Sequence, residues 1–250
     1  MFHAGIDIGS RTIKLVLVQD GEIYKTRLAS TGFQPMTGAK KLLQDLPITS
    51  IMATGYGRNL FEQQVGSTTV TEIKACARGL YYHHPEVTTI LDIGGQDVKV
   101  IRLGNKGRVL KFEMNDKCAA GTGKFLEIMS DNLGFTLDTF GAEALSANHA
   151  IPVSSMCTVF AETEITSLLA RGEDSREIAL GLHQSVVKRA ASMIRRTGGD
   201  GPLALVGGVA KNSCIQDLLA KELEREIVIP PSPQTIVALG AALLCAENSL

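Results

Sequence analysis

The sequence predicts an α/β protein built from two similar domains. The first observation is a set of three short strand patterns joined by tight turns near the N-terminus. The second is the return of this set at a constant offset of 85 residues, from Asp7 to Asp92. The third is a mostly helical region after residue 116 that ends in a further strand, a Gly-Gly pair and a closing helix. Alternating strand and helix patterns are typical of α/β folds.

The first copy begins as a hairpin. Gly5 to Val18 forms two strand patterns around a tight turn at Gly9 and Ser10, and Asp20-Gly21 turns the chain into a third strand. After the Asp20-Gly21 turn we expect the strand Glu22–Leu28, the helix Thr37–Asp45, the strand Ile48–Thr54 and the helix Thr71–Tyr82.

The second copy aligns with the first without a gap. Within Ile90–Val100, Asp92 matches Asp7, Gly94 matches Gly9 and Lys99 matches Lys14. Asn105-Lys106-Gly107 then leads into a third strand at Val109–Met114, which completes the same strand order. The duplication therefore predicts two similar domains that face each other.

Helices dominate the rest of the chain. Small residues in the last expected helix, Thr235–Ala246, would let its backbone lie close to that of neighbouring elements. The expected segments are helices at Ala119–Leu133, Leu137–Ala147, Thr158–Ala170 and Arg176–Thr197, a strand at Leu203–Val206, a helix at Ser213–Arg225, a strand at Ile227–Ile229, a crossing with Pro230, Pro231 and Pro233, and a helix at Thr235–Ala246.

Composition excludes several classes of function. A net charge of -1 among 250 residues gives no support for nucleic-acid binding. Hydrophobic residues make up 44%, which is enough for a large core, and no apolar run reaches the roughly 18 residues of a membrane span. The N-terminus lacks a signal-peptide pattern, so we expect a cytoplasmic protein. Five cysteines, an odd number, argue against a disulfide framework.

The Asp-x-Gly turn of each hairpin indicates a phosphate and Mg²⁺ site. Its glycines let backbone N–H groups approach phosphate oxygens, and the aspartate at the strand end has the oxygen chemistry that Mg²⁺ prefers. Asp7 and Asp92 are the Mg²⁺ candidates, or else turn formers. Lys14 and Lys99 either contact phosphate or are exposed strand residues. The candidate phosphate donors are Gly9, Ser10, Arg11, Gly94 and Gly95.

Two similar-looking segments are not expected to be nucleotide loops. Gly121-Thr122-Gly123-Lys124 lacks the first glycine and the final Ser or Thr of a Walker A loop, where Cys118 and Phe125 stand. Gly55-Tyr56-Gly57 lacks the third glycine of a Rossmann fingerprint, where Leu60 stands. Both are interpreted as backbone turns, with Lys124 either reaching a phosphate or solvated, and His83-His84 is interpreted as a loop.

Two cysteines stand at expected helix starts. Cys118 follows the cap-type residues Asn115 and Asp116, and Cys157 lies among the possible caps Ser154, Ser155 and Thr158. Such positions stabilise a thiolate. Two thiolates are half of a four-thiolate site, so a symmetric dimer would supply four ligands for an iron–sulfur cluster, whereas structural zinc usually has closer spacing. The remaining cysteines are expected to pack in the core; they are Cys76, Cys214 and Cys245.

The two Asp-Gly hairpins, the late Gly-Gly and the closing Gln-x-x-x-Ala-x-Gly-Ala-Ala helix resemble the actin, sugar kinase and heat-shock chaperone ATPase superfamily. The resemblance implies duplicated actin/ribonuclease H-like domains, each a mixed five-stranded sheet flanked by helices, with ATP in the interdomain cleft. It implies a first domain of residues 1–86 plus 231–250 and a second of residues 87–230. Gly207, Gly208, Lys211 and Asn212 would lie near the adenosine.

Four strings are more specific: Asp-Ile-Gly-Gly-Gln-Asp, Asn-Asp-Lys-Cys-Ala-Ala-Gly-Thr-Gly, Met-Cys-Thr-Val-Phe-Ala-Glu and Gly-Gly-Val-Ala-Lys-Asn. Together they resemble the activator ATPases of 2-hydroxyacyl-CoA dehydratases, a family that includes the ATPase subunits of benzoyl-CoA reductases. The resemblance implies a homodimer with one shared 4Fe-4S cluster, held by Cys118 and Cys157 of each subunit. It also implies ATP hydrolysis that drives low-potential one-electron transfer to a partner iron–sulfur enzyme in anaerobic metabolism, with ferredoxin or flavodoxin as donor.

Further roles stay open. Gln96 either orients the attacking water, as a glutamine does in some GTPases, or makes an ordinary hydrogen bond. Glu162 either couples nucleotide to cluster or lies on a solvated helix face. The acceptor is a 2-hydroxyacyl-CoA dehydratase, a benzoyl-CoA reductase or a double-cubane cluster protein. Competing functions are a small-molecule kinase, for which 250 residues leave little room for a substrate insertion, and an actin-like interaction module.

Overall fold

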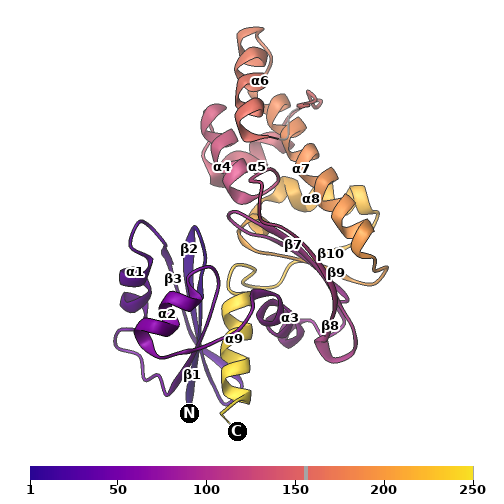
Figure 1. Ribbon diagram of the computed structural model, residues 1–250. Helices are drawn as coiled ribbons and strands as arrows, with labels where there is room; N and C mark the ends of the chain where they lie inside the picture. The colour runs from indigo at the N-terminus through magenta and orange to yellow at the C-terminus, as the bar shows by residue number, and fades with distance from the viewer. Residues whose placement is uncertain (155–156, 250) are drawn as a thin grey trace. The chain divides into compact units, whose positions relative to one another are not determined.

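The computed structural model describes residues 1–154 and 157–249, and it confirms the α/β fold with two five-stranded sheets (Figure 1). The strand orders are β3-β2-β1-β4-β5 and β10-β9-β6-β7-β8. Read from the other edge, the second order repeats the first, since β8-β7-β6 is a meander and β9 and β10 extend it. The duplication expected from the two Asp-Gly hairpins is therefore present in the strand topology.

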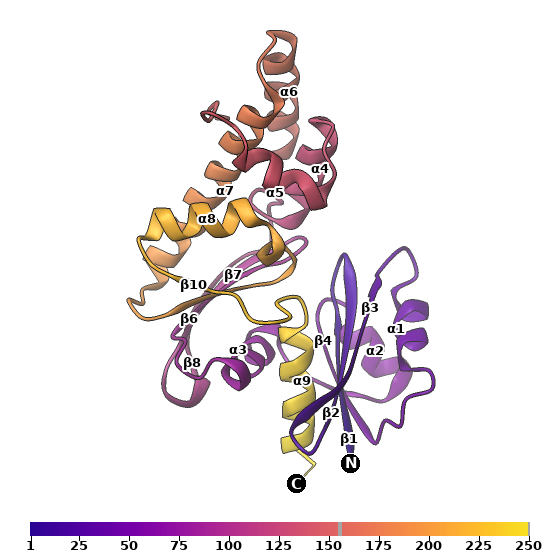
Figure 2. The same ribbon diagram turned by 180° about the vertical axis from the view of Figure 1, so that it is seen from behind.

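The helices and strands fall close to the segments expected from the sequence (Figures 1 and 2). The elements of the first half are β1 Phe2–Ile8, β2 Thr12–Gln19, β3 Glu22–Ser30, α1 Pro35–Leu43, β4 Ser50–Thr54, α2 Arg58–Val65, β5 Thr68–Thr69 and α3 Glu72–His83. The elements that follow are β6 Thr89–Ile93, β7 Val98–Leu103, η1 Asn105–Gly107, β8 Val109–Asn115, α4 Gly123–Asn132, α5 Leu137–Leu145, α6 Thr158–Ala170, α7 Ser175–Thr197, β9 Leu203–Val206, η2 Gly208–Lys211, α8 Ser213–Leu223, β10 Ile227–Val228 and α9 Ile236–Glu247.

The chain forms two compact units, which are described separately. Unit 1 contains Met1–Thr88, Ile101–Lys111 and Pro230–Leu250, and unit 2 contains Thr89–Val100 and Phe112–Ile229. The C-terminal helix α9 thus belongs with the N-terminal sheet. In unit 1, β1 runs antiparallel to β2 and parallel to β4, so the first sheet is mixed.

Glycines let the helices of unit 1 pack tightly. α9 contacts β1, β2, β4 and α3 (Figure 1). A Cβ at Gly5 would collide with the backbone of α9 at Ala238, and a Cβ at Gly240 would collide with the backbone of α3 at Ala75. The expectation that small residues in the last helix allow close backbone approach is therefore confirmed.

Unit 2 has one large core between its sheet and its helices. Phe125 of α4 and Phe140 of α5 are fully buried in it, together with residues of α7 and α8. The 23-residue helix α7 is capped by Asp174, whose carboxylate accepts hydrogen bonds from the backbone N–H groups of Arg176 and Glu177. In the described ranges, which omit residues 155–156 and 250, no helix is long and apolar enough to cross a membrane.

The structure differs from the expected elements at two places. α2 and β5 were not predicted, because α2 buries only Phe61 and therefore lacks an apolar stripe. α4 begins at Gly123 with Thr122 as its N-cap, four residues later than expected. The segment 119–122 is instead a turn, in which the Thr122 hydroxyl donates to the carbonyl of Ala119 at 2.6 Å.

Candidate functional site

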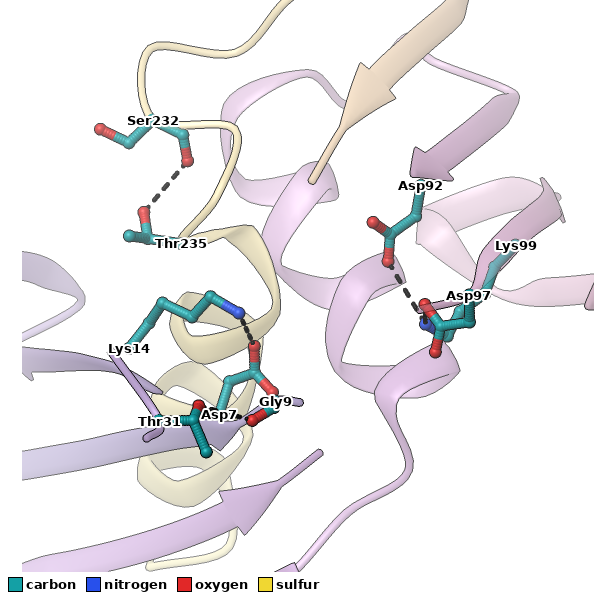
Figure 3. Close-up of polar contacts among 9 residues, drawn as sticks. All are labelled: Asp7, Gly9, Lys14, Thr31, Asp92, Asp97, Lys99, Ser232 and Thr235. Atoms are coloured by element: carbon teal, nitrogen blue, oxygen red, sulfur yellow. Dashed lines mark hydrogen bonds and ion pairs between the residues drawn. The ribbon is translucent and has the colours of Figure 1, made fainter. Parts of the chain in front are cut away.

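The β1–β2 hairpin of unit 1 places a buried ion pair at its turn. Asp7 and Lys14 are register partners, and the Lys14 Nζ lies 2.9 Å from Oδ2 of Asp7 (Figure 3). Their side chains are only 8% and 14% exposed. The alternative that Lys14 is an exposed strand residue is therefore wrong. Removing one partner of such a pair costs roughly 3–5 kcal/mol, because the other charge stays buried.

The turn itself is fixed by backbone hydrogen bonds. The N–H of Gly9 donates to the carbonyl of Thr12 at 3.2 Å. The side-chain hydroxyl of Thr31 donates to the carbonyl of Gly9 at 2.8 Å (Figure 3). Ser10 is half-buried and Arg11 is exposed. The hairpin thus presents a short loop with polar donors directly above the Asp7–Lys14 pair.

The β6–β7 hairpin of unit 2 repeats this arrangement and adds a carboxylate. The N–H of Gly94 donates to the carbonyl of Asp97 at 2.9 Å, as that of Gly9 does to Thr12. The Lys99 Nζ lies 2.7 Å from Oδ1 of Asp97 and 3.8 Å from Oδ2 of Asp92 (Figure 3). Lys99 is 3% exposed, so the alternative of an exposed strand residue is wrong here too. Gln96 is exposed on the turn.

Asp97 is a site residue that the sequence reasoning missed. The signal was present, because Asp97 ends the Asp-Ile-Gly-Gly-Gln-Asp string. In the structure Asp97 is as buried as Asp92, with 5% of its surface exposed against 4%. A Cβ at Gly94 would lie only 2.6 Å from Oδ1 of Asp97. Glycine at this position is therefore required by the packing of Asp97.

Asp7 and Asp92 each pack against a glycine that follows the neighbouring parallel strand. Gly55 follows β4 and Gly207 follows β9, and both have φ of +88°. A Cβ at Gly55 would lie 2.6 Å from Oδ1 of Asp7, and one at Gly207 would lie 2.6 Å from Oδ1 of Asp92. The Gly55 segment is a turn, as expected, but its role as the counterpart of Gly207 was not predicted.

The segment after Gly207 is held by a buried histidine. Asn212 caps α8 through a 3.0 Å hydrogen bond from the N–H of Ile215 to its Oδ1. Its side-chain amide donates to Nε2 of His183 at 3.0 Å, and Nδ1 of His183 donates to the carbonyl of Ala179 at 2.7 Å. Burial lowers the pKa of His183 to about 4. The Asn212 side chain thus serves the packing of α7 and α8, whereas Lys211 is exposed.

The five cysteines divide by burial. Cys76, Cys214 and Cys245 are buried, which confirms the packing interpretation. Burial raises the pKa of the Cys214 thiol to about 12 and also raises that of Cys245. Cys118 is half-buried and Cys157 is exposed, and none of the five cysteines, all of which lie in the described ranges, forms a disulfide.

Cys118 lies in the turn between β8 and α4. Asn115, the last residue of β8, donates through its side-chain amide to the carbonyl of Cys118 at 3.2 Å. Asn115 and Asp116 are therefore not the caps of α4, because the turn at 119–122 delays the start of that helix. The backbone N–H groups of Gly123 and Lys124 donate to the carbonyls of Gly94 and Gly95 at 2.9 and 2.8 Å. The Cys118 turn and the hairpin of unit 2 are thus joined through the first residues of α4.

Cys157 is itself the N-cap residue of α6. Ser154 does not cap this helix, because its N–H and hydroxyl both donate to Glu164, while Thr158 is the first helical residue and Ser155 lies outside the described residues. α6 packs against α4, so the helices that follow the two cysteines are neighbours. Glu162 is exposed, which agrees with a solvated helix face.

Two other sequence interpretations concern Lys124 and the histidine pair. The Lys124 side chain lies 3.5 Å from Glu127 on the surface of α4. His83 is the last residue of α3 and His84 caps it, so the expected loop is wrong for His83; His84 pairs with Glu86 at 3.1 Å. Within residues 1–154 and 157–249, no three His, Cys, Asp or Glu residues form a ready metal site.

The comparisons with known proteins point in one direction. The sequence profile of the BadF/BadG/BcrA/BcrD ATPase family matches residues 4–245. The chain is 40% identical to the 2-hydroxyisocaproyl-CoA dehydratase activator of Clostridioides difficile, over all of this chain and 96% of that protein. It is 41% identical to the activator of lactoyl-CoA dehydratase of Anaerotignum propionicum, over 99% of this chain and 98% of that protein.

A solved structure agrees with these relatives. The activator of the 2-hydroxyisocaproyl-CoA dehydratase from Clostridium difficile with bound ADPNP superimposes with a TM-score of 0.91. That match has 38% identity and covers all of this chain and 96% of the other. The actin-like ATPase fold expected from the sequence is therefore confirmed.

Proposed function

Because the chain belongs to the BadF/BadG/BcrA/BcrD ATPase family, we propose that it is an ATP-hydrolysing electron donor that activates a partner iron–sulfur enzyme. The partner class is a 2-hydroxyacyl-CoA dehydratase, with a benzoyl-CoA reductase or a double-cubane cluster protein as the alternative acceptor. Ferredoxin or flavodoxin would reduce the chain itself. The proposal places the protein in the cytoplasm, in anaerobic metabolism.

In this proposal ATP and ADP bind through the two Asp-Gly hairpins. The first domain, residues 1–86 plus 231–250, and the second, residues 87–230, contribute one hairpin each. Gln96, exposed on its turn, orients the attacking water. The residues that would hold the nucleotide are Gly9, Ser10, Arg11, Lys14, Gly94, Gly95, Gln96, Gly207, Gly208, Lys211 and Asn212, the last through its backbone.

The buried aspartates fit a Mg²⁺ ion. Asp7 is the penultimate residue of β1 and Asp92 that of β6, and both supply hard oxygen ligands, which Mg²⁺ prefers. The Thr54 hydroxyl supports this assignment, because it is fully buried beside Asp7 as its register partner and has no hydrogen-bond partner among the described residues. A buried orphan hydroxyl indicates a missing ligand or water at that place.

The two accessible thiols fit one half of a four-thiolate site. Cys118 and Cys157 precede the packed helices α4 and α6, whereas the other three cysteines are buried. A second copy of the chain would supply the other two thiolates, so we propose a homodimer that shares one 4Fe-4S cluster. The cluster would supply the one-electron redox chemistry. Val159 and Phe160, at the start of α6, are 67% and 66% exposed, which suits a face that a second copy covers.

The hydrogen bonds between the Gly94-Gly95 carbonyls and the start of α4 carry the coupling. A hairpin that closes on phosphate would pull on Gly123 and Lys124, and thereby shift α4 and the Cys118 turn that precedes it. Because ATP would bind one arrangement of this hairpin better than the other, ATP binding would favour the corresponding position of α4 and of the Cys118 turn. ATP hydrolysis then returns α4 and the Cys118 turn to the arrangement that they have without ATP.

The test is an anaerobic transfer assay. The reduced protein is mixed with an oxidised 2-hydroxyacyl-CoA dehydratase and ATP, ADP or no nucleotide, and the reduced acceptor is followed by electron paramagnetic resonance. We expect electron transfer in the presence of ATP, and none with ADP or without nucleotide. Transfer that is independent of nucleotide, or phosphate transfer to a small-molecule hydroxyl without any redox change, would contradict the proposal and favour the kinase alternative.

A further inference from the structure

Thr31 holds the turn of the β1–β2 hairpin from outside the hairpin. Thr12 and Ser30 are the register partners that end the β2–β3 ladder, so Thr31, one residue further, lies beside the turn. Its hydroxyl donates to the carbonyl of Gly9 at 2.8 Å (Figure 3). Its backbone N–H donates to the carbonyl of Arg11 at 3.0 Å. A single residue therefore restrains carbonyl groups on both sides of the turn.

The restrained carbonyl of Gly9 determines where the next N–H group points. The peptide bond between Gly9 and Ser10 is trans, and a planar trans peptide directs its N–H opposite to its carbonyl. Because the carbonyl of Gly9 points to the Thr31 hydroxyl, the N–H of Ser10 points away from Thr31. Ser10 is half-buried and Arg11 is exposed, so a ligand can reach this part of the turn.

The hairpin of unit 2 has the same restraint with a different donor. Gly94 matches Gly9 at the 85-residue offset, and its carbonyl accepts a hydrogen bond from the backbone N–H of Gly123 at 2.9 Å. The N–H of Gly95, which is the counterpart of Ser10, therefore also points away from the donor that holds its turn. The two hairpins thus restrain the same carbonyl through unrelated donors, a threonine hydroxyl and the first turn of a helix, and both preserve the same N–H direction.

We propose that Thr31 is a positioning residue of the nucleotide site, which orients the N–H of Ser10 toward a phosphate group through its hydrogen bond to Gly9. The inference rests on the proposed nucleotide binding, and it adds a residue outside the hairpin to that site. Backbone N–H groups in turns form anion-binding sites, and a hydrogen bond to a charged phosphate depends strongly on the direction of the donor. Thr31 does not contact the phosphate in this assignment, because its hydroxyl already donates to Gly9.

A purely structural role for Thr31 predicts a different pattern of binding. In that case the hydroxyl only stabilises unit 1, and Thr31→Val lowers stability and weakens every nucleotide or nucleoside by the same factor. In the proposed role, Thr31→Val weakens only ligands that carry phosphate, because adenosine has no phosphate for the N–H of Ser10 to bind. A loss of affinity for ADP that adenosine does not share is therefore specific to the proposed role.

The experiment measures the dissociation constants of ADP and of adenosine, both by displacement of fluorescent ADP. The wild-type chain, Thr31→Val, Thr31→Ser and Thr166→Val are compared, and thermal unfolding checks that each is folded. Thr31→Ser keeps the hydroxyl and removes only a methyl group. Thr166→Val is the matched control, because the Thr166 hydroxyl also donates to a backbone carbonyl, that of Glu162 at 2.9 Å, but on the exposed face of α6.

We expect Thr31→Val to raise the dissociation constant of ADP by on the order of 10-fold, the effect of losing one hydrogen bond to a charged group. The dissociation constant of adenosine should stay the same, and Thr31→Ser and Thr166→Val should match the wild type for both ligands. A Thr31→Val variant with wild-type affinity for ADP, an equal loss for adenosine, or a Thr31→Ser variant as weak as Thr31→Val would overturn the inference alone. A wild-type chain that binds no ADP would overturn the inference and the proposed function together.

Discussion

The backbone N–H of Gly123 donates a 2.9 Å hydrogen bond to the carbonyl of Gly94, which joins the first turn of α4 to the β6–β7 hairpin. Lys124 makes the same kind of bond to Gly95 at 2.8 Å. The first N–H groups of a helix have no partner within the helix, so the hairpin satisfies donors that would otherwise need water. The start of α4 and the hairpin therefore form one connected piece of backbone.

Replacing Gly123 with alanine tests this connection. A Cβ there would lie 3.1 Å from the carbonyl oxygen of Gly94 and 3.5 Å from Cα of Gly95, so the hairpin must shift by a few tenths of an ångström. We expect a stability loss of about 1 kcal/mol, typical of mild overpacking. Nucleotide-dependent electron transfer should fall more than nucleotide affinity. Equal losses of electron transfer and of nucleotide affinity, or no change in either, would show that the contact between Gly123 and Gly94 does not transmit the position of the hairpin.

Gly55 and Gly66 form a matched pair for the close approach to Asp7. Both have positive φ, +88° and +76°, but a Cβ at Gly66 meets nothing within 4 Å, whereas one at Gly55 meets Asp7. Gly66→Ala should therefore cost only the backbone strain, about 1 kcal/mol. Gly55→Ala should cost clearly more and weaken nucleotide binding, because the Asp7 carboxylate must move. Chemical denaturation and nucleotide titration of both variants check this, and equal losses would refute it.

Cys118→Ser and Cys157→Ser should each remove the iron–sulfur absorption while nucleotide binding persists. Cys118 is half-buried and Cys157 is exposed, and neither cysteine belongs to the β1–β2 or the β6–β7 hairpin. Cys245→Ala is the control, since Cys245 is buried in unit 1 against Ser50 and should leave the iron content unchanged. Iron analysis and equilibrium nucleotide binding provide the two readouts. Full iron content in either serine variant would remove that cysteine from the proposed ligand set.

His183 makes stability depend on pH. Its pKa is about 4 in the folded chain, against 6.5 for the free side chain, because burial disfavours the charged ring. Between these values the unfolded chain binds a proton that the folded chain does not. The free energy of unfolding should therefore be highest above pH 6.5 and fall by about 3 kcal/mol as the pH drops to 4.

Two variants isolate this effect in urea unfolding at pH 7, 5 and 4. His183→Gln removes the titrating ring and should flatten the curve in this window. His149→Gln alters a histidine whose side chain is 69% exposed, and it should keep the wild-type slope. A His183→Gln variant with an unchanged pH slope would assign the acid sensitivity to other groups.

Much of the fold could be predicted because local patterns and tertiary packing agree. The strand alternation around Gly9 and Gly94 defined both hairpins, and the constant offset defined their equivalence. α6 and β9 begin and end where their patterns predicted. α2 was missed since it contacts the core mainly through Phe61, and a polar helix leaves little periodic signal.

The site was predicted less completely, for reasons that are three-dimensional. Asp97 ends the Asp-Ile-Gly-Gly-Gln-Asp string, but the string alone does not show that its carboxylate contacts Lys99. The role of Asn212 depends on His183, which is 29 residues distant in sequence and meets it only in the folded core. The late start of α4 depends on a turn that the hydrogen bond from Asn115 to Cys118 holds. None of these contacts leaves a spacing rule in the sequence.

In the proposed function, two copies of this chain share one redox centre through Cys118 and Cys157. The most direct measurement is iron and sulfide analysis of the anaerobically purified protein combined with its native mass. We expect a dimer with four irons and four sulfides, that is, two of each per chain. A monomer, or a protein that contains no iron after anaerobic purification, would contradict it.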